Sequence, residues 1–185
     1  MRKHFVEGGV LFAGDEMSKY SFKKYEINLP KLFQREKNKL KKIIPNSKIE
    51  HIGSTSIPGL GGKGIIDIAI FTPKKMIKKY MKCLENIGYS YKPHPGDDKR
   101  KFMQKIIKYS GKERRIHIHL TLDKEFWNSF LAFRNYLREN KSVRDEYAKI
   151  KKEGARKSNG SGEKYFSHKK DFLKRIVKIA KENLG

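Results

Sequence analysis

A single carboxylate in an otherwise apolar stretch constrains this chain most. Residues 65–71 read Ile-Ile-Asp-Ile-Ala-Ile-Phe, and this β-branched run predicts a buried strand. A buried charge is costly unless it is paired, binds a cation or takes part in chemistry. Asp67 is therefore predicted to be a functional residue, and the strand that carries it is expected to lie at the centre of the fold.

A glycine-rich turn precedes this strand. Residues 53–64 contain five glycines, and backbone N–H groups in such a turn can approach an anion closely. Ser54 and Thr55 add hydroxyl groups, and Lys63 adds a cation. The turn is thus predicted to bind a polyphosphate. Asp67 would face it from the next strand, where a metal bound to phosphate needs a carboxylate.

The rest of the chain predicts an α+β protein, because helices flank and follow the strands. We expect an N-terminal arm or hairpin at 1–24, an α/β core at 25–122 and C-terminal helices packed on the core at 123–185. The polar loop 92–98 is a candidate lid. Apolar periodicity and turn residues predict helices at 29–44, 73–88, 123–140, 142–153 and after 162, and strands at 49–52, 100–109 and 114–122.

Two histidines alternate along a later strand. In residues 115–121 the alternation places His117 and His119 on one face. If this face and that of Asp67 point the same way, the three side chains converge as a catalytic and metal-binding group. Imidazole ligands favour Mn, Zn or Fe over Mg. Glu50, on the strand before the turn, is a further catalytic candidate, although the alternation alone does not decide whether it points inward.

The charge of the chain predicts an anionic partner. A formal net charge of +24 suits a nucleotide such as ATP, RNA or another polyanion. Biased coding composition would also enrich lysine together with isoleucine and asparagine, so the charge alone does not define a nucleic-acid surface. Cys83 is the only cysteine, which excludes an internal disulfide and fits a reducing compartment. No apolar run approaches a membrane span, so we expect a cytoplasmic protein without membrane contact; the oligomeric state stays open.

These motifs together resemble the signature of a known family. Residues 50–60 (EHIGSTSIPGL), Lys63 and residues 65–68 (IIDI) closely resemble the GrpB (UPF0157) family, a branch of the nucleotidyltransferase superfamily. The resemblance covers about residues 22–182, although the family's usual Trp is Leu29 here. It continues at residues 117–119 and 133–138, at Tyr147 with Lys151 and at Tyr165 with Lys169.

The resemblance implies a polymerase-β-like nucleotidyltransferase fold, a small mixed sheet flanked by helices. It places Gly53 and Ser54 on the turn that takes the triphosphate of an NTP, and it implies a divalent metal, Mg or Mn, with Zn as an alternative. The superfamily pattern has a second carboxylate two residues after the first, where this chain has Ala69. The predicted phosphate or acceptor contacts further along the chain are Arg115, Arg134 and Lys169.

Three functions follow from these residues. The first is metal-dependent transfer of a nucleotidyl group from an NTP to an unknown acceptor. The second is a catalytically reduced module that binds a nucleotide, a coenzyme A-related ligand or RNA; family members fused to dephospho-coenzyme A kinase suggest the coenzyme A version. The third is a hydrolase that uses Asp67, His117 and His119 on a transition metal.

Overall fold

The structure is a computed structural model that describes residues 22–93 and 99–183. Most of the expected N-terminal arm and most of the candidate lid at 92–98 therefore lie outside the described residues. The helices are α1 (Leu29–Ile43), α2 (Ile77–Glu85), α3 (Lys124–Glu139), α4 (Lys141–Lys157) and α5 (Gly162–Glu182). The strands are β1 (Lys48–Ile52), β2 (Ile66–Phe71), β3 (Ser90–Tyr91), β4 (Arg100–Tyr109) and β5 (Lys112–Thr121).

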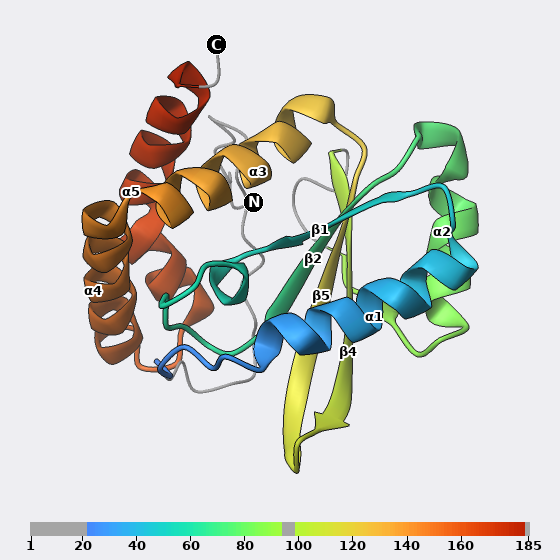
Figure 1. Cartoon of the computed structure of the whole chain (residues 1–185), viewed down its shortest axis with the longest axis horizontal. Helices are drawn as coiled ribbons and strands as arrows, with labels where there is room; N and C mark the ends of the chain where they lie inside the picture. Colours follow the sequence, from blue (N-terminus) through green and yellow to red (C-terminus); the bar gives the residue numbers. More distant parts are fainter. Residues whose placement is uncertain (1–21, 94–98, 184–185) are drawn as a thin grey trace, which may run out of the picture.

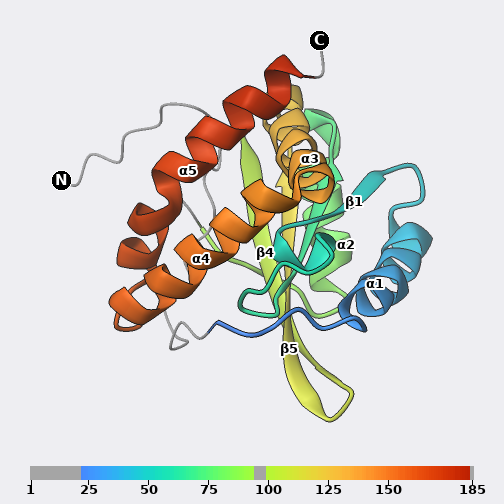
Figure 2. The same ribbon diagram turned by 60° about the vertical axis from the view of Figure 1, so that its left-hand side comes forward.

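The strands form one mixed five-stranded sheet in the order β1-β2-β5-β4-β3 (Figure 1). β2 and β5 pair in parallel, and the other neighbours pair antiparallel. The β4–β5 hairpin extends beyond the helices in Figures 1 and 2. The fold class predicted from the sequence, α+β with a small mixed sheet flanked by helices, is confirmed.

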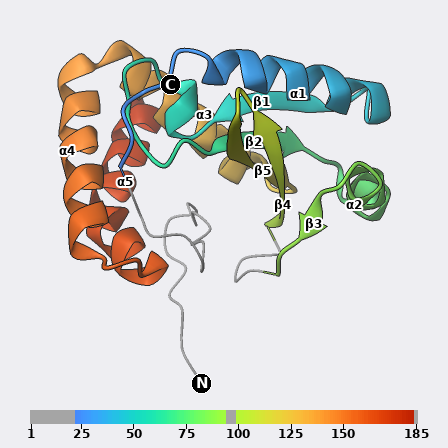
Figure 3. The ribbon, with the colours of Figure 1, turned by 90° about the horizontal axis from the view of Figure 1, so that it is seen from below.

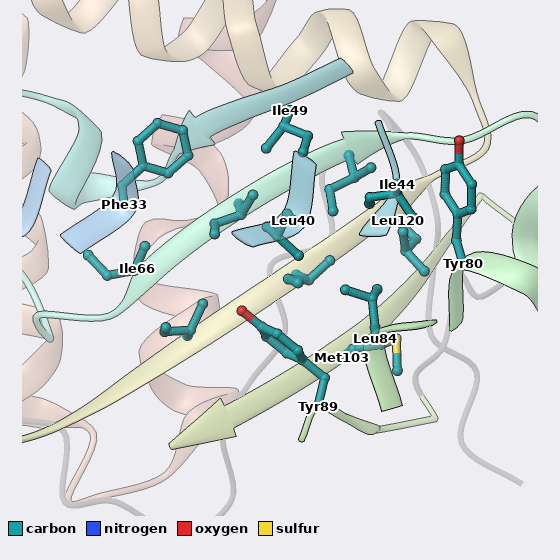
Figure 4. Packing of buried hydrophobic residues seen from close by; sticks show 14 of the residues in the cluster. Phe33, Leu40, Ile44, Ile49, Ile66, Tyr80, Leu84, Tyr89, Met103 and Leu120 are labelled. Carbon is teal, nitrogen blue, oxygen red and sulfur yellow. The ribbon is translucent and has the colours of Figure 1, made fainter. Parts of the chain in front are cut away.

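One face of the sheet packs against α1 and α2. Leu40 of α1 and Leu84 of α2 are fully buried against Ile68 and Ile118 of the central strands (Figure 4). Burying a side chain of this size contributes about 1.5–3 kcal/mol. This layer fixes β2 and β5 side by side, and it therefore fixes the backbone that carries the predicted site residues.

The other face of the sheet is covered by α3. Trp127 and Phe130 pack with Ile52 and Ala69 of the sheet, as expected of a core stripe. α4 and α5 pack on each other at the opposite end of the molecule from α2 (Figures 1 and 3). Within the described ranges, no helix has both the length and the apolarity needed to cross a bilayer.

Two helix starts differ in how well the sequence predicted them. Asp123 caps α3 as expected, because its carboxylate accepts a hydrogen bond from the Phe126 N–H at 2.6 Å. Thr72, the residue before the helix predicted at 73–88, does not cap it: its buried hydroxyl donates to the Ile70 carbonyl at 3.3 Å. A short 3₁₀ turn, Lys74–Met76, separates it from α2. The predicted helix therefore begins as a tighter turn.

Candidate functional site

Asp67 of β2 meets two histidines of β5. The parallel register sets Asp67 beside His117, and Ala69 beside His119, so these side chains share the face under α3. His117 Nδ1 lies 3.2 Å and His119 Nε2 lies 3.5 Å from Asp67 Oδ1. The two polar faces thus point the same way, as the strand alternation allowed.

Arg100 of β4 fixes the proton on His119. The Arg100 side chain is buried, and its guanidinium contacts His119 Nδ1. Guanidinium groups only donate hydrogen bonds, so Nδ1 is the acceptor and the ring proton of neutral His119 is on Nε2. This N–H then donates to Asp67 Oδ1. Arg100 therefore orients the carboxylate through His119, a relationship that the sequence did not predict.

The charges of this group follow from burial and these contacts. Burial disfavours ionised Asp67, but hydrogen bonds from His117 and His119 outweigh it and hold the Asp67 pKa far below its usual range. Burial and, to a smaller extent, the positive charge of Arg100 together lower the pKa of His119 to about 4, against the opposing effect of the hydrogen bond to Asp67. At neutral pH the pair is thus a carboxylate with a neutral imidazole.

The glycine turn lies against this carboxylate. Gly53 has φ 67° and ψ −174°, a region that essentially only glycine occupies. A Cβ at this position would collide with Asp67 Oδ2. Ser54 follows at the start of the 3₁₀ turn Ser54–Ser56. Asp67 therefore points toward the predicted phosphate turn, with one oxygen held by histidines and the other beside Gly53.

A pocket opens between this turn, the two central strands and the C-terminal helices. Two of its walls repeat one pattern, a tyrosine followed four residues later by a lysine, at Tyr147 and Lys151 on α4 and at Tyr165 and Lys169 on α5. The described residues that line it are Gly53, Ser54, Lys63, Ile65, Asp67, His117, His119, Phe133, Tyr147, Lys151, Tyr165 and Lys169.

All three lysines of the pocket have a pKa below the ordinary value for lysine. Burial lowers the pKa of Lys63 to about 8 and that of Lys169 to about 7, the latter with the help of the Lys63 charge. Burial and the charge of Lys169 also place the Lys151 pKa well below its ordinary value. Asp67 acts in the opposite direction on all three. Such a cluster of ammonium groups is favourable only when an anion lies among them.

Thr55, predicted to bind phosphate, has a structural position instead. Its buried hydroxyl donates to the Ile65 carbonyl at 2.9 Å and lies 3.0 Å from His51 Nε2. Because the hydroxyl proton is already donated, His51 Nε2 must be the donor in the second contact. Burial lowers the His51 pKa to about 3, which agrees with a neutral ring. Thr55 thus links His51 of β1 to Ile65, the residue before β2.

Glu50 and Arg134 bind each other. Arg134 Nη1 lies 2.7 Å from Glu50 Oε2 and donates to the His51 carbonyl at 2.8 Å. Glu50 lies directly opposite Ala69 in the β1–β2 ladder, but this ion pair holds its carboxylate on α3. Neither residue lines the pocket, and neither does Arg115. Their predicted catalytic and phosphate-binding roles therefore have no support from the geometry.

The donor set does not fit a metal ion held by histidines. Neither nitrogen of His119 offers a lone pair, since Nδ1 accepts from Arg100 and Nε2 carries the proton directed at Asp67. In the described part of the chain, no three His, Cys, Asp or Glu side chains are grouped so that they could hold a metal ion. We derive no step through a metal bound by Asp67, His117 and His119, and the transition-metal hydrolase loses its basis.

The sequence as a whole matches one protein family. The family model described as "GrpB protein" matches residues 20–179 of the chain. The chain belongs to the GrpB family. The resemblance found in the signature residues is therefore confirmed, and the match includes α4 and most of α5, whose tyrosines and lysines complete the pocket.

Two relatives of this GrpB-family chain align with most of its length. A UPF0157 protein of Halalkalibacterium halodurans is 32% identical over 159 residues, which cover 84% of this chain and 80% of the relative. The crystal structure of GrpB from Enterococcus faecalis is 33% identical, with a TM-score of 0.74 over 89% of this chain and 99% of that one. Cid1 poly(U) polymerase with MgGTP bound aligns at 14% identity and a TM-score of 0.48, over 69% of this chain and 45% of Cid1. That likeness is too low to carry an argument.

Proposed function

We propose that this GrpB-family protein is a nucleotidyltransferase that takes a nucleoside triphosphate such as ATP as its donor. One observation carries the proposal: the Gly53 turn, ionised Asp67 and three lysine side chains all line a single pocket. A glycine turn admits a phosphate chain close to backbone N–H groups, and lysines balance its charge. A carboxylate beside them can accept a hydrogen bond from the hydroxyl group of an acceptor and orient it for attack.

The proposed step is an in-line displacement at the α-phosphorus. An acceptor hydroxyl oxygen forms a bond to this phosphorus while the bond from phosphorus to the β-bridging oxygen breaks. Asp67 Oδ2 orients the hydroxyl group through a hydrogen bond and, because its pKa is low, takes the proton only after the new bond to phosphorus has made the hydroxyl group strongly acidic; the proton then passes to solvent, and pyrophosphate leaves with the electron pair of the broken bond. The lysines stabilise the charge that develops on the leaving group. His119 and Arg100 hold Asp67 in position.

A divalent cation enters this proposal only with the substrate, as the Mg or Mn complex of the nucleotide. Asp67 is the only carboxylate among the described residues that line the pocket, and one of its oxygens already accepts from the histidines. A nucleotide-bound cation also finds oxygen ligands on the phosphates themselves. The metal requirement is therefore an outcome of the assay below.

The test is transfer of label from an α-labelled nucleotide to the protein, to RNA or to small hydroxyl acceptors, with Mg or Mn present. We expect label transfer by the wild-type chain and a loss of at least 100-fold in Asp67→Asn, which keeps the size of the side chain. The matched control is Asp171→Asn on the exposed side of α5, which should transfer normally. If no acceptor is labelled under any of these conditions, the proposal fails.

A second function is favoured by one specific observation. Ala69 stands where the superfamily has its second carboxylate, and Glu50, its partner across the β1–β2 ladder, is engaged by Arg134. Among the described residues that line the pocket, no other acid replaces the missing one. The alternative is therefore a module that binds a nucleotide, a coenzyme A-related ligand or RNA without turnover.

The two functions differ in measurable ways. A binding module would be stabilised against heat by the nucleotide, yet no label would move and Asp67→Asn would still bind. RNA as the ligand would bind with an affinity that falls steeply with salt, because phosphate contacts release counterions. Salt-independent binding would remove RNA from consideration. Turnover that depends on Asp67 would remove the whole alternative.

A further inference from the structure

The pocket carries more positive than negative side-chain charge. When protonated, Lys63, Lys151 and Lys169 contribute three ammonium groups, and Asp67 contributes the only carboxylate among the described lining residues. These lysines come from three different elements, the glycine-rich loop, α4 and α5. A cluster assembled from such distant positions is not the outer face of one helix. It requires a ligand with at least two negative charges.

The three lysine side chains are held in place before any ligand arrives. Lys151 is buried, and its Nζ donates to the Gly61 carbonyl at 2.6 Å and lies 5.4 Å from the centre of the Tyr147 ring. The Nζ atoms of Lys169 and Lys63 lie 4.6 and 5.2 Å from the centre of the Tyr165 ring. Each cation thus rests near an aromatic ring, at a distance where the ring attracts it.

The backbone makes room for this cluster. The loop passes close to it at Gly62, since an added Cβ would lie 2.5 Å from both Lys151 Nζ and Ser54 Oγ. Any larger residue would therefore displace the lysine or the serine. The loop, the serine of the phosphate turn and the α4 lysine are consequently packed as one unit on the same side of the pocket.

We propose that the lysine cluster binds a pyrophosphate group directly and takes the charge-neutralising role that a second metal ion has in two-metal phosphoryl transfer. The ligand class is a phosphoanhydride, which carries enough negative charge to balance three ammonium groups against one carboxylate. This inference rests on the proposed function for the identity of the site. It adds Lys151 to the predicted phosphate contacts and assigns pyrophosphate binding to side chains of the chain itself.

A second cation beside Asp67 is the competing arrangement, and the side chains oppose it. Ala69 offers no oxygen ligand, and Glu50 is engaged by Arg134. A divalent ion there would also add charge to a pocket that already has an excess of ammonium groups, at short range and away from bulk water. Lysine side chains need no carboxylate ligands and satisfy the same phosphate oxygens with N–H donors.

The experiment measures binding of inorganic pyrophosphate to the full chain by calorimetry, in EDTA and without any divalent ion. We expect wild-type protein to bind in EDTA and Lys151→Met to bind at least 10-fold more weakly. Lys152→Met is the matched control, because Lys152 is exposed on the same helix, and it should bind as wild type does. Orthophosphate should bind more weakly than pyrophosphate, and ATP in EDTA at least as tightly.

Two checks keep the outcomes distinct. The melting temperature of unliganded Lys151→Met shows whether the variant folds; if it does not, Lys63→Met replaces it, with the same expected loss. Binding that appears only when Mg or Mn is added, or that is unchanged in the folded lysine variant, overturns the inference. Pyrophosphate binding in EDTA without label transfer from nucleotides supports the inference while the proposed function fails. Label transfer combined with pyrophosphate binding that requires a metal ion would support the proposed function and overturn the inference.

Discussion

The carboxylate of Asp67 lies so close to the α-carbon of Gly53 that no side chain fits between them. The two residues come from different elements, the turn after β1 and the strand β2, and their contact closes one side of the pocket. A phosphate bound at the turn would therefore lie next to the carboxylate that receives the proton of the acceptor. This contact makes Gly53 a sharper probe of the site than any charged residue.

Gly53→Ala should abolish function by occlusion. The new methyl group would force Asp67 away from the turn, and the backbone conformation would disfavour alanine as well. We expect label transfer and pyrophosphate binding to fall at least 100-fold. The measurements are the transfer assay and calorimetry, with circular dichroism to establish that the variant is folded.

Gly88→Ala separates occlusion from backbone strain. Gly88 also has a positive φ, 89°, but an added Cβ there meets no atom within 4 Å. Its alanine variant should lose about 1 kcal/mol of stability from strain alone and keep normal binding and transfer. Equal functional losses in both alanine variants would show that strain, and not contact with Asp67, explains the effect at Gly53.

Arg100→Gln should change the titration of His119. Arg100 lowers the pKa of this imidazole through its charge and holds Nδ1 as an acceptor. Removing the guanidinium should therefore raise the His119 pKa above its value of about 4 and lower label transfer, because Asp67 loses its fixed partner. Histidine NMR signals followed against pH measure the shift directly.

Lys101→Gln is the matched control for Arg100. Lys101 is the next residue of β4, so its side chain lies on the opposite face of the sheet. Its Nζ atom lies 5.9 Å from the centre of the Tyr91 ring. Its variant should leave the His119 titration and the transfer rate unchanged. A His119 pKa that does not move in Arg100→Gln would show that burial alone lowers it, and the positioning role would be withdrawn.

Sequence periodicity was sufficient for the parts of the site that lie on neighbouring strands. Alternation placed Asp67 on one face of β2 and the two histidines on one face of β5, and parallel pairing brought these faces together. The turn residues Gly53 and Ser54 could be predicted because a glycine-rich segment indicates a turn whose backbone can approach an anion closely. These features are local, or depend on a single strand pairing.

The residues that the sequence missed depend on contacts between distant segments. Lys151 shares a family motif with Tyr147, but the motif alone does not place it in the site, because only the packing of α4 brings it to the glycine loop. The repeat of the same spacing at Tyr165 and Lys169 was the available signal. No sequence pattern pointed to Arg100, since its burial against His119 follows from the β4–β5 register.

Thr55→Val should destabilise the protein and leave pyrophosphate binding unchanged. The valine leaves the His51 N–H and the Ile65 carbonyl without their partner, and two buried polar groups lose their hydrogen bonds. We expect a loss of about 1–3 kcal/mol in the free energy of unfolding, measured by denaturant titration. Thr55→Ser keeps the hydroxyl and should lose much less. Weaker pyrophosphate binding by folded Thr55→Val would return Thr55 to the phosphate contacts.

Pyrophosphate binding should be coupled to proton uptake at Lys169. In the unliganded protein the pKa of Lys169 is about 7, so half of this side chain is neutral at that pH. A bound anion favours the ammonium form and raises the pKa, so binding takes up protons between the two pKa values. The contribution of Lys169 to affinity is therefore full below pH 7 and is lost as the pH rises toward the pKa of the complex.

Comparison of wild type with Lys169→Met isolates this contribution. The ionisation of pyrophosphate itself is common to both proteins, so the difference between their pH profiles belongs to Lys169 and the groups coupled to it, Lys63, Lys151 and Asp67. We expect the variant to bind more weakly at pH 6.5, with a gap that narrows at high pH. Calorimetry in buffers of different ionisation enthalpy should show proton uptake by the wild type near pH 7.5 and less by the variant. A gap that stays constant as the pH rises from 6.5 to 8 would mean that Lys169 is already fully protonated in the empty pocket, and the coupling would be refuted.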